Sequence, residues 1–267
     1  GLADTFKALD EHGLDHVGAG FTEMEASEPY FFVDREGRRL AVINCAEQEF
    51  SIAQDSAGGA ALLDPVVVFR NIQAAKFKAD YVIVITHGGH ENYNLPTTKF
   101  KSMLRFFVDA GAAAVVNHHT HNISGFETYK GKPIYYSLGN FLFGKDTIGH
   151  KYWNKGLAVE IDFSENHVST SNYFFHQQIS GSIFRLLNGD YASELELEFE
   201  RLSKLIGSDD ELDRHFEDWC IKSELYYSIN IEPHNIRVLQ VLQNRNLLPS
   251  LWRRRKKLYL LNMLRCT

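Results

Sequence analysis

A continuous run of β-branched and aromatic residues at positions 81–86, Tyr-Val-Ile-Val-Ile-Thr, restricts the fold of this chain more than any other feature. Runs without polar alternation are typical of strands covered on both faces, as in proteins that alternate helices with parallel strands. Helical patterns lie on either side of the run, at residues 65–77 and 97–110, and a second apolar run follows at residues 113–116. The sequence therefore predicts an α/β fold that contains parallel strands.

Other segments predict antiparallel strands. Residues 30–33 and 39–44 flank an Arg-Glu-Gly-Arg turn, which predicts a hairpin. Residues 157–163 and 168–175 alternate apolar with polar side chains, which predicts an antiparallel pair with one face in solvent. Residues 133–138 form a further strand pattern. We therefore expect an α+β sandwich of mixed sheets that is flanked by helices.

The last third of the chain has a different composition. Residues 193–206 and 209–227 are charged and have helical patterns, and residues 252–264 form a basic helical pattern. We therefore expect two parts, a main domain at residues 1–180 and a helical C-terminal extension at residues 181–267.

Composition excludes several classes of protein. A net charge of -6 and a pI near 6.1 give no overall attraction to nucleic acid, so we expect no nucleic-acid partner. The three cysteines Cys45, Cys220 and Cys266 lack paired spacing, so neither a disulfide framework nor a thiolate metal site is predicted. No apolar run approaches the roughly 20 residues of a membrane span, and no signal-peptide pattern opens the chain. Localisation in the cell envelope or the cytoplasm therefore stays open.

Histidines stand where the two predicted parallel strands end. His87 follows the first strand, and His118, His119 and His121 follow the second. The carboxyl ends of neighbouring parallel strands meet at one edge of a sheet, where ligands bind. On an extended segment, side chains alternate, so His119 and His121 would point to one side and His118 to the other. We therefore expect His87, His119 and His121 to bind a divalent metal ion.

Three further polar residues are candidates for chemistry. His90 and Glu91 follow two glycines, which let the backbone bend closely around a site, and they are candidates for a general acid and a substrate contact. Asn140 follows a predicted strand and is a candidate for substrate binding, as a donor to an anion. Ordinary loop and turn polarity is the alternative interpretation for all three.

The basic run Arg-Arg-Arg-Lys-Lys at residues 253–257 has three interpretations. It could contact an anionic membrane, bind an acidic polymer, or form a solvated helix face. We favour the solvated face, because basic residues at a helix end also complement the helix dipole.

Four short blocks occur in a fixed order along the chain. They are His-Gly-Gly-His-Glu-Asn-Tyr-Asn-Leu-Pro at 87–96, Asp-Ala-Gly at 109–111, Val-Asn-His-His-Thr-His at 116–121 and Ile-Tyr-Tyr-Ser-Leu-Gly-Asn-Phe at 134–141. Their order and spacing resemble the CapA family of bacterial capsule and poly-γ-glutamate synthesis proteins, which share the calcineurin-like metallophosphoesterase fold. The resemblance covers residues 1–175.

This resemblance implies a function and a set of site residues. It implies a metal-dependent phosphoesterase-like hydrolase that acts in the synthesis of capsule or another extracellular polymer. His87, His119 and His121 would bind Mn, Zn or Fe, as part of a dinuclear centre in a complete protein. The implied partners are a phosphoester or anionic polymer substrate and the capsule synthesis machinery. Asn117 stands where the family block has glycine.

The resemblance also implies that a strand with an aspartate, and a loop with an asparagine and a histidine, would precede Gly1. Three neutral imidazoles cannot offset two cations or set their spacing, which is the task of a bridging carboxylate. We therefore expect this chain alone to hydrolyse phosphoesters slowly or not at all.

Two other functions are compatible with parts of this pattern. One is a non-catalytic component of capsule assembly that keeps the fold and binds polymer. The other is a barrel amidohydrolase, which also uses a His-x-His pair at a strand end. In such barrels the pair belongs to the first strand, whereas here it comes late in the chain, so we disfavour the barrel.

Overall fold

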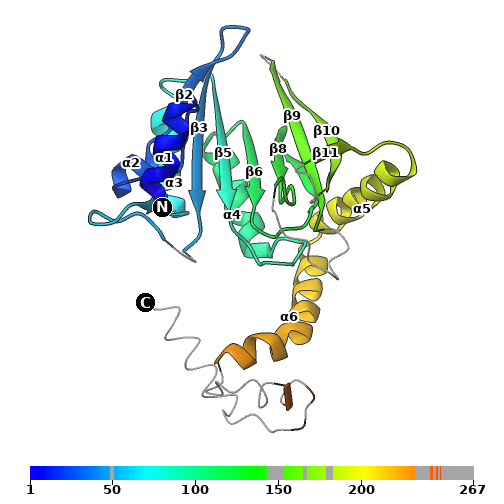
Figure 1. The fold of residues 1–267 in the computed structure, drawn as a ribbon. Helices are drawn as coiled ribbons and strands as arrows, with labels where there is room; N and C mark the ends of the chain where they lie inside the picture. The colour runs from blue at the N-terminus through cyan, green and yellow to red at the C-terminus, as the bar shows by residue number, and fades with distance from the viewer. Residues whose placement is uncertain are drawn as a thin grey trace. The chain divides into compact units, whose positions relative to one another are not determined.

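The structure is a computed structural model that describes residues 1–48, 51–142, 153–164, 167–178 and 183–231, and the single positions 241, 242, 245 and 247. The chain divides into two compact units, Gly1–Asp213 and Arg214–Thr267. The sheets and the candidate site belong to the first unit (Figure 1). In the described part of the chain, no helix is long and apolar enough to cross a lipid bilayer.

Six strands form the central sheet of the first unit, in the order β2-β3-β5-β6-β8-β7. The inner pairs β3–β5, β5–β6 and β6–β8 are parallel, and the outer pairs β2–β3 and β7–β8 are antiparallel. The strands are β2 (Tyr30–Val33), β3 (Arg39–Ala46), β5 (Tyr81–His87), β6 (Ala114–His118), β7 (Phe126–Tyr129) and β8 (Lys132–Tyr135). The predicted hairpin and the predicted parallel strands are therefore confirmed.

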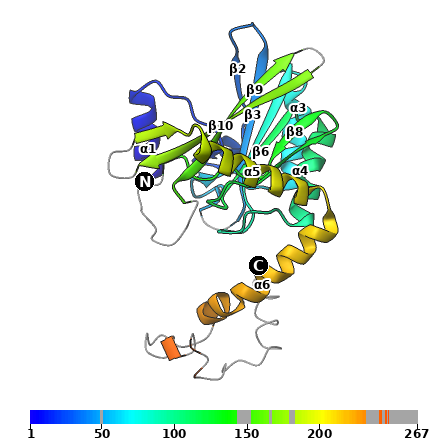
Figure 2. The same ribbon diagram turned by 90° about the vertical axis from the view of Figure 1, so that its right-hand side faces the viewer.

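A second sheet of three antiparallel strands, in the order β11-β10-β9, packs against the central sheet. Its strands are β9 (Lys155–Ser164), β10 (His167–Gln178) and β11 (Ile183–Leu186). Val116 and Tyr135 of the central sheet share an apolar cluster with Leu157 and Phe174 of the second sheet. In Figure 2, β9 and β10 run across the central sheet. The expected α/β sandwich of mixed sheets is confirmed. A short third sheet pairs β1 (Ala19–Gly20) with β4 (Gly59–Ala60).

Strand β5 is covered on both faces, although not equally. Val82 and Val84 are fully buried, whereas Tyr81 and Ile83 are half-buried and pack against a cluster that includes Phe163 of β9. Because side chains alternate along a strand, the two valines point away from the second sheet. The uninterrupted apolar run in the sequence follows from this double coverage.

Helices complete the first unit, and their ends follow from their sequences. Helix α3 (Pro65–Ala75) begins after Asp64, whose carboxylate accepts from the backbone N–H groups of Val66 and Val67. Helix α4 (Thr98–Ala110) begins after the capping Thr97 and ends at Gly111, which has a φ of 118°. Two further helices are α1 (Leu2–Glu11) and α2 (Glu23–Ser27).

The first compact unit extends beyond residue 180. Strand β11 pairs with β10, and helix α5 (Asp190–Ile206) buries Leu195 and Phe199 in the same apolar cluster as the two sheets. Helix α6 (Asp209–Ile231) follows. The two compact units therefore do not divide at the boundary that we expected near residue 180. The assignment of residues 1–180 to a family domain and of residues 181–267 to a helical extension stays a prediction. The basic stretch at residues 252–264 lies outside the described residues.

Lys101 of α4 is a buried cation that connects three helices. Its side chain is 2% exposed, and its Nζ donates to the carbonyl of Ile206 at 2.6 Å and to Oδ1 of Asp209 at 2.7 Å. The first acceptor ends α5, and the second lies in the first turn of α6. A cation at a helix C-terminus is favourable, because the carbonyl groups there lack partners within the helix.

Replacement of Lys101 by Met should lower the free energy of unfolding by about 1–3 kcal/mol, because the carbonyl of Ile206 loses its buried donor. Urea denaturation followed by circular dichroism measures the change. Lys99→Met is the matched control, since Lys99 is exposed on the same helix. Equal stabilities for the two variants would contradict this role of Lys101.

Candidate functional site

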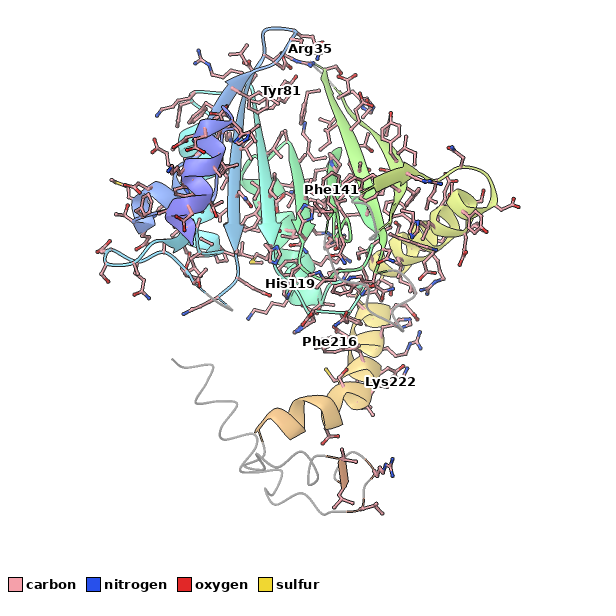
Figure 3. All side chains as sticks on the ribbon, in the orientation of Figure 1. Arg35, Tyr81, His119, Phe141, Phe216 and Lys222 are labelled. Carbon is pink, nitrogen blue, oxygen red and sulfur yellow. The ribbon has the colours of Figure 1, made fainter. Side chains whose placement is uncertain are left out.

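The candidate site lies at the carboxyl edge of the parallel strands. In the register of the central sheet, Ala46 of β3 pairs with His87 of β5, and His87 pairs with His118 of β6. The three strands therefore end level with one another, and the residues that follow them meet at one edge. Figure 3 labels His119 at this edge.

His87 and His119 are in direct contact. Nε2 of His87 lies 3.1 Å from Nδ1 of His119, and the ring centroids are 4.9 Å apart. His119 is buried, whereas His87 is partly open to solvent at the strand end. The strand ends thus bring together two of the three histidines that we expected to act as metal ligands.

His121 lies next to this pair but is turned toward other partners. Its ring centroid is 6.2 Å from that of His119 and 4.9 Å from that of Trp153. Its Nδ1 lies 2.7 Å from Oδ1 of Asn140. His121 therefore lies beside His119, with Trp153 and Asn140 against its ring.

The backbone that carries His119 and His121 is not extended. His119 has a φ of 108° and His121 a φ of 59°, both in the left-handed region that favours glycine. The expectation that strand alternation would point the two imidazoles to one side is therefore wrong. A tight loop after β6 brings them near each other, and His118 still belongs to the strand.

Asn140 is buried and held at both ends of its amide. Its Nδ2 donates to the carbonyl of Trp153 at 3.0 Å, and its Oδ1 faces Nδ1 of His121. The amide that we expected to bind substrate is engaged by groups of the chain itself. Its contact with His121 does place it at the candidate site.

Glu47 is a residue of this site that sequence reasoning missed. Its Oε2 accepts from the backbone N–H of Gly89 at 3.2 Å, and its Oε1 lies 3.4 Å from Nε2 of His119. Its own N–H donates to the carbonyl of His87 at 2.9 Å. In the sequence Glu47 is one acidic residue after a strand, and only the pairing of β3 with β5 brings it to the histidines.

Glu91 and His90 lie in the turn after β5. Oε1 of Glu91 is 4.0 Å from Nε2 of His121, and the Glu91 side chain is more than half exposed. The carbonyl of His90 accepts from the N–H of Tyr93, which closes the turn. Glu91 therefore borders the cluster on its solvent side, and His90 precedes it in the same turn.

Asn117 lies on the buried side of the histidine cluster and connects the ends of the neighbouring strands. Its Nδ2 donates to the carbonyls of Gly88 and Tyr136, both at 2.9 Å, and its Oδ1 accepts from Thr86 at 2.7 Å. Asn117 and Thr86 are fully buried. A glycine at this position could not make these bonds, so the asparagine side chain holds the neighbouring strand ends together.

Burial keeps the strand-end histidines neutral. Burial and the neighbouring histidines lower the pKa of His87 from 6.5 to about 4. Burial also lowers the pKa of His118. His87 is therefore neutral near pH 7, and a neutral imidazole has one ring nitrogen with an open lone pair.

Neutral imidazoles are suitable metal ligands, so the cluster can be compared with a metal centre. Two nitrogens bound to one tetrahedral zinc ion lie about 3.3 Å apart, close to the separation of the His87 and His119 nitrogens. This pair fits a metal ion. Within the described residues, however, no three His, Cys, Asp or Glu side chains are grouped closely enough to form a full set of ligands.

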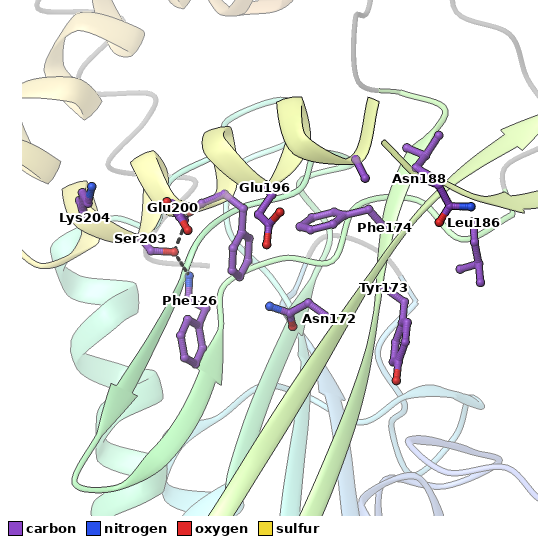
Figure 4. A pocket seen from close by; sticks show the side chains of 13 residues that line it. Phe126, Asn172, Tyr173, Phe174, Leu186, Asn188, Glu196, Glu200, Ser203 and Lys204 are labelled. Atoms are coloured by element: carbon purple, nitrogen blue, oxygen red, sulfur yellow. Dashed lines mark hydrogen bonds between the residues drawn. The ribbon is translucent and has the colours of Figure 1, made fainter. Parts of the chain in front are cut away.

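A large cavity of the first unit lies elsewhere. It has a volume of about 870 Å³ and lies between α5 and strands β7, β10 and β11, with Phe126, Asn172, Glu196 and Glu200 in its wall (Figure 4). Its lining contains none of the histidines at the strand ends. The histidine cluster is thus separate from this cavity.

The fold and the site together define a class: an α/β sandwich with a polar, histidine-rich site at the carboxyl edge of its parallel strands. A profile of the family described as bacterial capsule synthesis protein PGA_cap matches residues 1–145, which is more than half of the chain. The chain belongs to this family. The resemblance noted in the sequence is therefore confirmed.

Individual relatives agree with this assignment. The capsule biosynthesis protein CapA of Bacillus anthracis is 36% identical over 149 residues, which cover 54% of this chain and 36% of that protein. The PGA biosynthesis protein CapA of Bacillus subtilis strain 168 is 33% identical over 145 residues, which cover 54% of this chain and 38% of that protein. This chain therefore spans little more than a third of the length of either relative.

Among solved structures, a provisionally assigned 5'-nucleotidase from Staphylococcus aureus matches with a TM-score of 0.36 and 10% identity. The match covers 70% of this chain and 36% of that one. A similarity this low does not bear on the site.

The low pKa of His87 predicts a loss of stability in acid. The unfolded chain takes up a proton at this histidine below about pH 6.5, whereas the folded chain takes it up only near pH 4, so the free energy of unfolding should fall across that interval. Urea denaturation at several pH values measures the slope. His87→Gln should make the slope shallower. An unchanged slope in His87→Gln would refute the assignment.

Proposed function

We propose that this chain carries part of a metal-dependent, phosphoesterase-like site in a protein of capsule or poly-γ-glutamate synthesis. Membership of the capsule synthesis family supports the biological context. Its substrate would be a phosphoester or an anionic polymer, and its partners would be the machinery that makes the polymer. Metal binding and hydrolysis are the parts of this proposal that experiments have to establish.

The observation that carries the proposal is the contact between His87 and His119. Two ring nitrogens, from the ends of neighbouring parallel strands, approach to 3.1 Å, and the pKa of His87 is low enough to keep its ring neutral. Two neutral imidazoles that face each other can share one proton or together bind one cation. His121 is the third ligand that we propose, because its ring lies beside that of His119.

The residues around the pair have distinct roles in this proposal. A divalent cation such as Mn, Zn or Fe supplies a Lewis acid that polarises a phosphoryl oxygen and lowers the pKa of a bound water. Glu91, exposed and 4.0 Å from His121, can accept or donate a proton at the solvent side of the site. His90 lies in the same turn and is the second candidate for proton transfer.

Isothermal titration calorimetry with Mn²⁺ and with Zn²⁺ tests the ligands directly. His87→Ala and His119→Ala should each weaken metal binding by at least about tenfold. Replacing a residue that only hydrogen-bonds to a metal ligand already weakens binding by about 10- to 100-fold, and these two variants remove a ligand itself. His12→Ala, at an exposed position after α1, is the matched control and should bind as the natural chain does. Equal binding by all four proteins would place any metal site elsewhere.

Hydrolysis is a separate question with its own test. The metal-loaded chain is assayed with p-nitrophenyl phosphate and with bis(p-nitrophenyl) phosphate, and Glu91→Gln and His119→Ala should both reduce any turnover that is found. Binding of poly-γ-glutamate that is unchanged in His119→Ala would favour the alternative function, a non-catalytic component that binds the polymer.

A further inference from the structure

We infer that Glu47 and Asn140 are positioning residues that preset the tautomers of His119 and His121, so that Nδ1 of His119 and Nε2 of His121 carry the open lone pairs. This inference rests on the proposed function only where it explains the tautomers as a preparation for metal binding. The tautomers themselves can be measured in the metal-free chain.

Asn140 determines the tautomer of His121. The amide Nδ2 of Asn140 donates to the carbonyl of Trp153, so the amide oxygen is the atom that faces Nδ1 of His121 at 2.7 Å. Turning the amide over would place its oxygen against the carbonyl oxygen of Trp153, where no proton lies between the two acceptors. Nδ1 of His121 must therefore carry the proton, which leaves the lone pair on Nε2. The carboxylate of Glu91 lies 4.0 Å from Nε2 and is exposed to solvent, so it does not outweigh the 2.7 Å contact with Asn140.

Glu47 acts on His119 through the charge of its carboxylate and not through a hydrogen bond. The carboxylate is oriented by the N–H of Gly89, which donates to Oε2 at 3.2 Å, and its other oxygen lies 3.4 Å from Nε2 of His119. A carboxylate offers only acceptors, so it favours a proton on Nε2. The lone pair of His119 is then on Nδ1, the nitrogen that faces His87 at 3.1 Å.

The two residues act on opposite ring nitrogens, which is why both are needed. His119 is open at Nδ1 and His121 at Nε2, although the two histidines are separated by one residue in the sequence. In the metal-free chain, His87 must then donate from its Nε2 to His119. A carboxylate or carbonyl behind a ligand histidine fixes its ring and raises its basicity.

Two-bond ¹H–¹⁵N correlation spectra of the histidine rings test the inference in the metal-free chain, recorded at a pH above which the ring chemical shifts no longer change. The natural chain should show His119 protonated at Nε2 and His121 at Nδ1. Glu47→Gln is nearly isosteric but has one acceptor and one donor. Because Gly89 requires the acceptor, the new NH₂ group faces His119 and should switch its proton to Nδ1. His121 should not change.

Asn140 is tested with a matched pair of variants. Asn140→Asp keeps an acceptor toward His121 and should retain the Nδ1–H tautomer, whereas Asn140→Leu removes the acceptor and should give a mixture. Glu47→Gln should also weaken Zn²⁺ binding by about 10- to 100-fold, measured by calorimetry. A purely structural role would change the unfolding midpoint and leave the tautomers as they are.

The opposite tautomer of either histidine in the natural chain would overturn the inference, and this result does not depend on any variant folding. An unchanged His119 in a folded Glu47→Gln protein would also overturn it. If the tautomers are as stated but no Zn²⁺ binds, the inference stands and the proposed function fails.

Discussion

The level register of three parallel strands is the constraint on which the site depends. β3, β5 and β6 end opposite one another, so Glu47, Gly88 and His119 emerge at one edge of the sheet. Asn117 holds this arrangement from inside the protein, because one buried amide bonds to the carbonyls of Gly88 and Tyr136. Because Asn117 bonds to groups on both sides of its strand, a shift of either neighbouring strand would leave several buried groups unsatisfied. The rigidity of the edge thus comes from the hydrogen bonds beneath it.

Local sequence signals were sufficient for the elements of the fold. The apolar run before His87 marked a strand covered on both faces, and the helical patterns at residues 65–77 and 97–110 correspond to α3 and α4. The family blocks then identified the edge where polar residues gather. What local patterns do not contain is which strands are neighbours. Glu47 was missed for that reason, since it reaches His119 only through the pairing of β3 with β5.

The geometry of the site also depends on backbone conformations that the sequence conceals. His119 and His121 were placed on one side by assuming an extended segment, whereas both adopt positive φ angles. Histidine has no strong signal for that conformation, unlike glycine. The position of Asn140 relative to His121 likewise depends on a contact across 19 residues, between two loops that no periodic pattern connects. The candidate residues could therefore be identified from the sequence, but their relative positions could not, because these depend on topology and on unusual φ angles.

The left-handed backbone at His119 and His121 sets stability against function in this loop. A side chain in that conformation costs roughly 1–2 kcal/mol relative to glycine, because the Cβ atom crowds the neighbouring peptide groups. A glycine at either position would therefore relax the loop, and selection for thermal stability alone would move toward it. Laboratory evolution for a more heat-resistant variant would tend to erase this pair of histidines. The loop is accordingly a poor target for stabilising substitutions and a sensitive marker of whether a related sequence retains the site.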